Sequence, residues 1–122
     1  MAIDEACTSF RKFDMSLGGV GFFPRGDKSI VWLGINDSKP LKILYSRIEK
    51  SLQKQGFGKN RQGLSPHITL GREVVLRKSY DEIKKENIIK DGKINVESVI
   101  LYESKRVGPK LLYVPKYIKK LK

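Results

Sequence analysis

The chain has 122 residues, 39% of them hydrophobic, and a formal net charge of +12 from 25 basic and 13 acidic side chains. This length predicts a single domain over residues 1–122, and the lack of a long apolar run excludes a membrane-spanning helix. The single cysteine excludes an internal disulfide and favours a reducing compartment, so we expect a cytoplasmic protein. The charge attracts polyanions such as RNA, and a lysine-rich solvated surface explains it equally well.

The N-terminal residues predict a helix followed by a strand. Residues 2–12 place apolar side chains at helical spacing, and residues 13–17 alternate apolar and polar side chains as a strand does. The glycines at 18, 19 and 21 indicate a bend or bulge in that strand.

An apolar strand and an amphipathic helix follow. The continuous apolar run 29–35, after a polar turn at 25–28, predicts a strand buried on both faces. Ser38 is a favourable helix N-cap and Gly56 a helix stop, so the apolar stripe between them predicts a helix packed on the core.

The stretch 65–72 alternates again and predicts a half-buried strand. On such a strand His67, Thr69 and Gly71 share one face, and Arg72 points to the other. The imidazole can transfer a proton near neutral pH, and the hydroxyl can donate to an anionic oxygen. Taken alone, His-x-Thr is more often a structural histidine beside a strand-forming threonine.

The remaining residues predict a short helix at 79–89 with Ser79 as its cap, a tight turn at 91–92, and two strands at 94–103 and 110–114. The basic tail 116–122 carries much of the excess charge, and we interpret it as a solubilising segment.

The wider context of the motif changes its interpretation. Pro-His-Ile-Thr-Leu-Gly-Arg at 66–72 resembles the second His-x-Thr motif of the 2H phosphoesterases, and its closest branch is the RNA 2',3'-cyclic phosphodiesterases, also called 2'-5' RNA ligases or LigT-like proteins. The segments 31–35, 56–57, 101–104 and 108–113 agree with that family in order and spacing. The resemblance implies an α+β LigT-like fold with an antiparallel sheet and helices packed on one side. It further implies that the chain is the C-terminal two-thirds of such a domain, truncated at the N-terminus.

The resemblance also implies roles for individual residues. His67 is the histidine that activates water, and Thr69 holds a phosphoryl oxygen. Arg72, Arg61 and Tyr113 are candidates for substrate contact, with surface charge or packing as the competing interpretation of each. Because one cysteine and one histidine cannot make a usual zinc site, we expect no metal and no cofactor.

The family uses two His-x-Thr motifs, whereas this chain has one histidine. The chain is then a piece of a complete enzyme, a natural truncated product, or one of two chains whose His67 sites face each other. We expect an RNA 2',3'-cyclic phosphodiesterase, acting on RNA or a nucleotide with a cyclic phosphate, with no membrane partner. The alternative is a basic RNA-binding remnant without catalysis. Uncovered strand edges also predict a homodimer.

Overall fold

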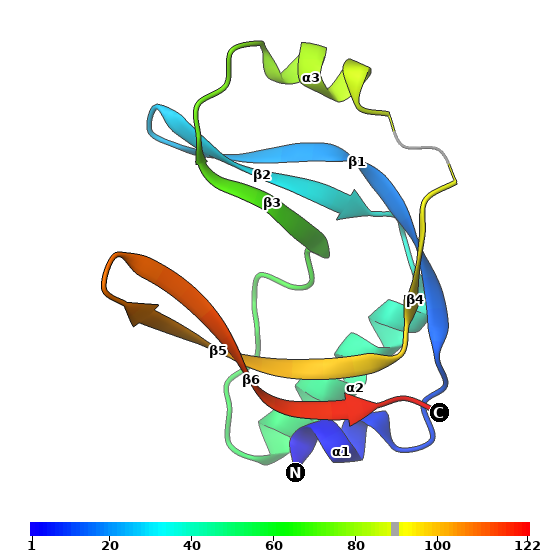
Figure 1. Ribbon diagram of the computed structural model, residues 1–122. Helices are drawn as coiled ribbons and strands as arrows, with labels where there is room; N and C mark the ends of the chain where they lie inside the picture. Colours follow the sequence, from blue (N-terminus) through cyan, green and yellow to red (C-terminus); the bar gives the residue numbers. More distant parts are fainter. Residues whose placement is uncertain (89–90) are drawn as a thin grey trace. The chain divides into compact units, whose positions relative to one another are not determined.

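The computed structural model describes residues 1–88 and 91–122. The helices and strands follow the chain in the order α1 (Ala2–Cys7), β1 (Phe13–Arg25), β2 (Lys28–Ile35), α2 (Lys39–Lys54), β3 (His67–Val74), α3 (Tyr80–Glu86), β4 (Lys93–Val96), β5 (Ser98–Val107) and β6 (Lys110–Lys120) (Figure 1). They form two compact units, each assembled from separate stretches of chain. Whether these units act as the single domain expected from the length stays a prediction.

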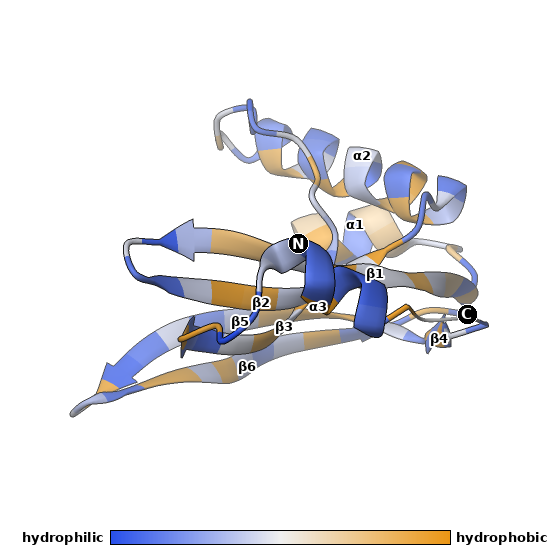
Figure 2. Ribbon diagram, turned by 90° about the horizontal axis from the view of Figure 1, so that it is seen from above, coloured by the Kyte–Doolittle hydropathy of each residue, from blue (hydrophilic) through white to orange (hydrophobic). Residues whose placement is uncertain are grey.

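The first unit contains residues 1–13, 42–61 and 95–122. Its core is formed by the buried side chains of Ile3, Cys7, Leu44 and Leu121. Figure 2 shows the hydrophobic residues of α2 along one side of the helix, as its sequence periodicity predicts. Ser38 Oγ accepts a hydrogen bond from the Leu41 amide at 3.3 Å, which confirms the predicted N-cap.

The C-terminal residues of this unit differ from the expectation of a solubilising tail. Residues 116–120 belong to β6, and the Leu121 side chain is buried in the core. The Leu121 amide donates to the Glu97 carbonyl at 2.8 Å, and the Lys122 amide donates to the Phe10 carbonyl at 3.0 Å. The tail is structural because Tyr117 and Leu121, on one side of the alternating chain, belong to the core or pack against it. Lys116, Lys120 and Lys122 are exposed.

The second unit contains residues 14–41 and the described part of 62–94. The four-stranded sheet has the order β3-β2-β1-β4, and both the β1–β2 and the β2–β3 pairs are antiparallel. The register of β1 against β2 shifts between Leu17 and Val20, so the predicted bulge at the glycines is confirmed.

One face of this sheet carries α3. The Tyr80 ring stacks on Phe22 with the centroids 4.5 Å apart, and its hydroxyl lies 2.9 Å from Ser29 Oγ. β2 is an internal strand, but most of its side chains are only half-buried, so the expected burial on both faces is too strong. The prediction of an α+β fold built on antiparallel strands is confirmed.

The predicted boundaries hold best where local signals set them. The first helix ends at Cys7, not at residue 12, and the strand predicted at 94–103 is divided into β4 and β5 at Glu97. The third helix begins at its Ser79 cap and ends at Glu86; the last residue of the predicted range, Ile89, lies outside the described residues. In the described ranges, no helix combines the length and apolar character needed to cross a membrane.

Candidate active site

The strand that carries His67 and Thr69 lies at one side of the four-stranded sheet. β3 begins at His67, directly after Pro66, and is the terminal strand next to β2. His67 lies opposite Gly34 and Thr69 lies opposite Trp32 in regular antiparallel register. Because opposing residues share a face, His67 and Thr69 lie on one face of the sheet, as predicted. Both are exposed, and Ile68 between them is 39% exposed, so β3 is less buried than its alternation suggested.

Aromatic side chains surround His67 on this face. The Trp32 ring centroid lies 6.0 Å from that of His67, and the Phe23 ring meets the His67 ring edge-on at 5.4 Å. Phe23 and Trp32 also contact each other, with their centroids 5.2 Å apart. The imidazole is therefore supported on one side by apolar rings, which limits the orientations it can adopt.

Two glycines make room for the indole. A Cβ atom at Gly21 would lie 2.1 Å from Trp32 Cη2, and one at Gly34 would lie 3.3 Å from Trp32 Cζ3. The Trp32 ring thus packs against the backbone of Gly21 and Gly34, where no side chain stands in its way. Among the described residues, Trp32 Nε1 is the one buried side-chain polar atom without a hydrogen-bond partner. The indole is therefore held by shape and not by a hydrogen bond.

A backbone carbonyl orients the histidine ring. His67 Nδ1 lies 2.7 Å from the Ser65 carbonyl oxygen. Since a carbonyl oxygen only accepts, Nδ1 must carry the hydrogen and donate it. In the neutral ring the unprotonated nitrogen is then Nε2. This is the tautomer that a general base needs at Nε2.

The strand becomes irregular directly after Thr69. Thr69 opposes Trp32 and Gly71 opposes Val31, so two steps along β3 correspond to one step along β2. Glu73 has a positive φ of 54°, and a second register shift separates the Gly71 and Val74 pairings. This register shift interrupts the alternation of side chains along β3 before Gly71 and Arg72. The sequence-based assignment of Gly71 to the His67 face and of Arg72 to the opposite face therefore does not follow from alternation alone.

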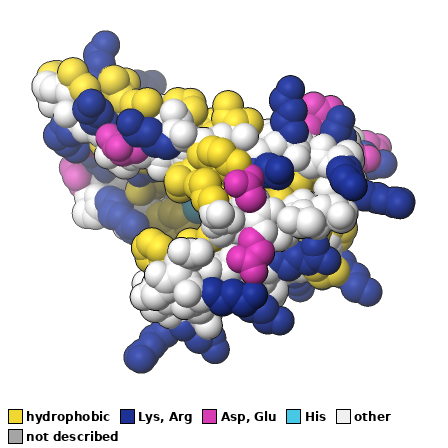
Figure 3. All heavy atoms as spheres, turned by 90° about the horizontal axis from the view of Figure 1, so that it is seen from below, with side chains coloured by type: hydrophobic (Ala, Val, Ile, Leu, Met, Phe, Trp, Pro, Cys, Tyr) yellow, Lys and Arg dark blue, Asp and Glu magenta, His cyan; other side chains and the backbone are white. Residues whose placement is uncertain are grey.

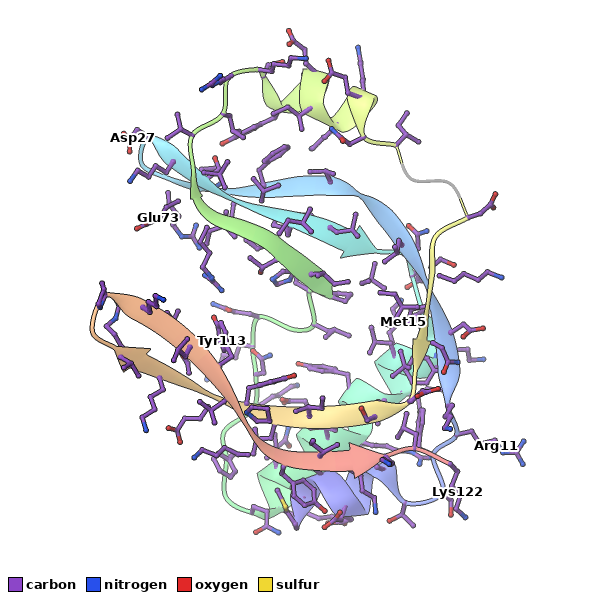
Figure 4. All side chains as sticks on the ribbon, viewed as in Figure 1. Arg11, Met15, Asp27, Glu73, Tyr113 and Lys122 are labelled. Carbon is purple, nitrogen blue, oxygen red and sulfur yellow. The ribbon has the colours of Figure 1, made fainter. Side chains whose placement is uncertain are left out.

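The other two candidates belong to the first unit. Arg61 ends its middle segment, in the loop after α2, and Tyr113 lies on β6 (Figure 4). The loop beside Arg61 is attached to α2: the Asn60 side chain donates to Tyr45 Oη at 3.0 Å, and its amide donates to Glu49 Oε2 at 3.2 Å. Within one unit, the structure brings together His67 and Thr69, with Arg72 further along the same strand.

Metal ligands do not gather at this face or elsewhere in the described ranges. No group of three or more His, Cys, Asp or Glu side chains is arranged to hold an ion there. The chemistry that His67 and Thr69 can carry out directly is proton transfer and hydrogen bonding to an anion.

The family model of the 2'-5' RNA ligase superfamily matches residues 2–108. This chain belongs to the 2'-5' RNA ligase superfamily. An RNA 2',3'-cyclic phosphodiesterase from Aeropyrum pernix is 32% identical over 117 residues, which cover 88% of this chain and 66% of that protein.

Solved structures confirm the fold expected for a superfamily member. A phosphoesterase crystal structure has a TM-score of 0.73 at 21% identity and covers 96% of this chain and 64% of its own. The structure of E. coli LigT complexed with 3'-AMP has a TM-score of 0.69 at 19% identity and covers 95% of this chain and 64% of that chain. The protein thus has a LigT-like fold, and it spans about two thirds of the length of these relatives.

The sequence alone did not indicate which groups contact His67, namely Trp32, Phe23 and the Ser65 carbonyl. Trp32 is two residues before Gly34 and therefore shares its face, but placing it next to Thr69 requires the register of β2 on β3. Phe23 requires in addition the register of β1 on β2. Ser65 acts through its carbonyl oxygen, which every residue type has.

Proposed function

We propose that this chain provides the water-activating half of an RNA 2',3'-cyclic phosphodiesterase. The observation that carries the proposal is the exposed pair of His67 and Thr69 on one strand face, with the histidine Nδ1 committed to the Ser65 carbonyl. Two further facts support it: the chain belongs to the superfamily, and the Aeropyrum pernix relative is named as an enzyme of this activity.

The proposed reaction is the hydrolysis of one phosphodiester bond in the cyclic ester. His67 Nε2 takes a proton from water as the water oxygen bonds to phosphorus. The bond from phosphorus to one ribose oxygen breaks, and that oxygen takes up a proton. The Thr69 hydroxyl donates to a non-bridging oxygen as negative charge develops there. Arg72, Arg61 and Tyr113 remain proposed substrate contacts.

The proton for the departing ribose oxygen needs a second group. His67 is the one histidine of the chain, so this acid is another residue type or comes from outside the 122 residues. The same observation favours a second candidate function, RNA binding without catalysis. The two candidate functions differ in the role of His67. Hydrolysis requires the imidazole to transfer a proton, whereas RNA binding without catalysis does not.

The test is hydrolysis of 2',3'-cyclic AMP, and of a short RNA with a cyclic end, in the presence of EDTA. The chain is assayed alone and extended by a segment with a second His-x-Thr motif. In an active form, His67→Ala should lower turnover at least about 10²-fold, as expected for loss of a general base. The free energy of unfolding should change little because the side chain is exposed.

Three outcomes would contradict the proposal. Loss of activity in EDTA and its recovery on addition of zinc or magnesium would contradict the metal-free mechanism. Unchanged turnover in His67→Ala with a large loss of stability would make His67 a structural residue. RNA binding without turnover in every form would leave the second candidate.

A further inference from the structure

The outer part of the β5–β6 hairpin is exposed on both faces. Its residues from Tyr102 to Pro115 pair in regular register, with Tyr102 opposite Pro115 and Val107 opposite Lys110. Tyr102, Val107, Leu112 and Tyr113 are each between 44% and 53% exposed. Exposed apolar surface of this kind commonly marks a place where something binds.

The register divides these residues into two unlike faces. Opposing residues share a face, so one face, called here the tyrosine face, carries Tyr102, Ser104, Arg106, Leu111, Tyr113 and Pro115. The other, called here the aliphatic face, carries Glu103, Lys105, Val107, Lys110, Leu112 and Val114. Both aromatic rings of the outer hairpin are therefore on the same side.

The two tyrosines are neighbours on their face. Tyr113 lies opposite Ser104, and Tyr102 lies two residues before Ser104 on the same strand, which makes the tyrosines a diagonal pair. Diagonal Cβ atoms in an antiparallel pair are about 7–8 Å apart. At this separation the rings lie side by side, so each can offer a flat surface to a separate base. Figure 4 shows Tyr113 projecting from β6.

The charge of the hairpin favours an anionic partner. Residues 98–120 include six basic side chains and one acidic side chain, Glu103. Lys116 Nζ lies 3.6 Å from Glu103 Oε2, so the single acid is already matched. Figure 3 shows Lys and Arg side chains spread over the visible surface, with fewer acidic ones among them. Protein interfaces are depleted in lysine, whereas single-stranded nucleic acids are bound by basic surfaces with interleaved aromatic rings.

We infer that the tyrosine face binds unpaired nucleotides of an RNA strand, with bases stacked on Tyr102 and Tyr113 and Arg106 against the backbone phosphates. The inference rests on the proposed function for the choice of RNA among polyanions. It extends that function by proposing that the RNA strand, whose end carries the cyclic phosphate, binds to the hairpin.

The test measures binding of oligoadenylate of about ten nucleotides, within the range of single-strand site sizes, by filter binding. The His67→Ala background prevents turnover, so the result does not depend on catalysis. Tyr102→Ala and Tyr113→Ala should each weaken binding about 5- to 150-fold, the loss expected for one stacked base. The corresponding phenylalanine variants keep the ring and should bind like the parent.

The two faces of the hairpin provide matched controls. Arg106→Gln and Lys105→Gln remove the same charge from adjacent residues on opposite faces. The arginine change should weaken binding more and reduce the slope of log affinity against log salt by about one contact, near 0.7 for a single strand. Leu112→Ala truncates an exposed apolar side chain on the aliphatic face and should have no effect.

Several results would overturn the inference. These are tyrosine-to-alanine variants that bind like the parent, equal losses in both glutamine variants, or no binding by the parent. A dimer that Tyr113→Ala dissociates would assign the face to protein contact. The proposed function fails separately, through unchanged hydrolysis in His67→Ala, and that result leaves the binding data intact.

Discussion

Thr69 is the residue whose role the structure makes easiest to isolate. It shares a strand face with His67, and the residue opposite it on β2 is Trp32. Valine matches threonine in shape but lacks the hydroxyl, so Thr69→Val in an active enzyme should lower kcat about 10²- to 10³-fold. Thr69→Ser retains the donor and should retain most of the activity. Steady-state kinetics with cyclic AMP separate these results, and a fully active valine variant would show that the hydroxyl is not used.

The residue scale also shows where sequence reasoning holds. His67 and Thr69 could be assigned to one face because alternation is a property of every strand. Arg72 could not be oriented in the same way, since the register shift between Thr69 and Gly71 breaks the alternation. No local signal predicts that irregularity, because it is set by how β3 pairs with β2.

At the scale of elements, β1 must pass beneath the indole without a side chain at Gly21. A methyl group there would lie 2.1 Å from Trp32 Cη2, whereas a Cβ atom at Gly19 meets no atom within 4 Å. Gly21→Ala should therefore cost about 1–3 kcal/mol of unfolding free energy through overpacking, and Gly19→Ala should cost much less. Urea unfolding followed by circular dichroism measures both. Equal stability of the two variants would mean that the indole moves away freely.

The contact between α1 and β6 depends on pH. Tyr117 donates a hydrogen bond to Asp4, and Lys119 Nζ lies 3.6 Å from the same carboxylate. The hydrogen bond from Tyr117 is the main reason that the pKa of Asp4 is lowered from 3.8, with Lys119 and the N-terminal amine acting in the same direction. The same bond raises the pKa of Tyr117 above 10.0.

The sign of the pH effect follows from these directions. A lowered carboxyl pKa gives stability that is present above the unfolded value and lost as the pH falls through the folded value. A raised tyrosine pKa gives stability that is lost as the pH rises through its folded value. Tyr117→Phe should therefore lower Tm at about pH 7, and the difference from the parent should shrink as the pH falls through the lowered pKa of Asp4. Thermal unfolding across this acid range tests the prediction, and a difference that stays constant as the pH falls would contradict it.

Helices and strands were predictable from the sequence where neighbouring residues determine their ends. The bounds of α2 follow from Ser38 and Gly56, whose capping chemistry is written in neighbouring residues. The break at Glu97 and the buried Leu121 were missed because they depend on contacts between distant segments. A basic tail looks the same in sequence whether or not its apolar residues are buried.

At the scale of the whole molecule, the terminal strand β3 predicts self-association. Leu70 on this strand is 58% exposed, and a terminal strand presents backbone groups on its outer edge. We propose a two-fold dimer that pairs the β3 edges. The net charge of +12 opposes it, so association should tighten as salt rises, opposite in sign to the RNA binding that we propose.

Sedimentation across protein and salt concentration measures this equilibrium. Leu70→Lys should shift it toward monomer, whereas Ile43→Lys, the same change at a 41% exposed site on α2, should not. A monomer under all conditions, or equal effects of both variants, would contradict pairing through β3.

The close approach of Trp32 and His67 has a practical consequence. Each is the one residue of its type in the chain, and their ring centroids lie 6.0 Å apart. Emission excited at the indole therefore comes from the side of the sheet that carries the proposed catalytic base. Binding of a nucleotide against His67 should alter this emission in the unlabelled protein, and Trp32→Phe should abolish the response. The protein thus contains its own optical reporter of occupancy at its proposed catalytic base.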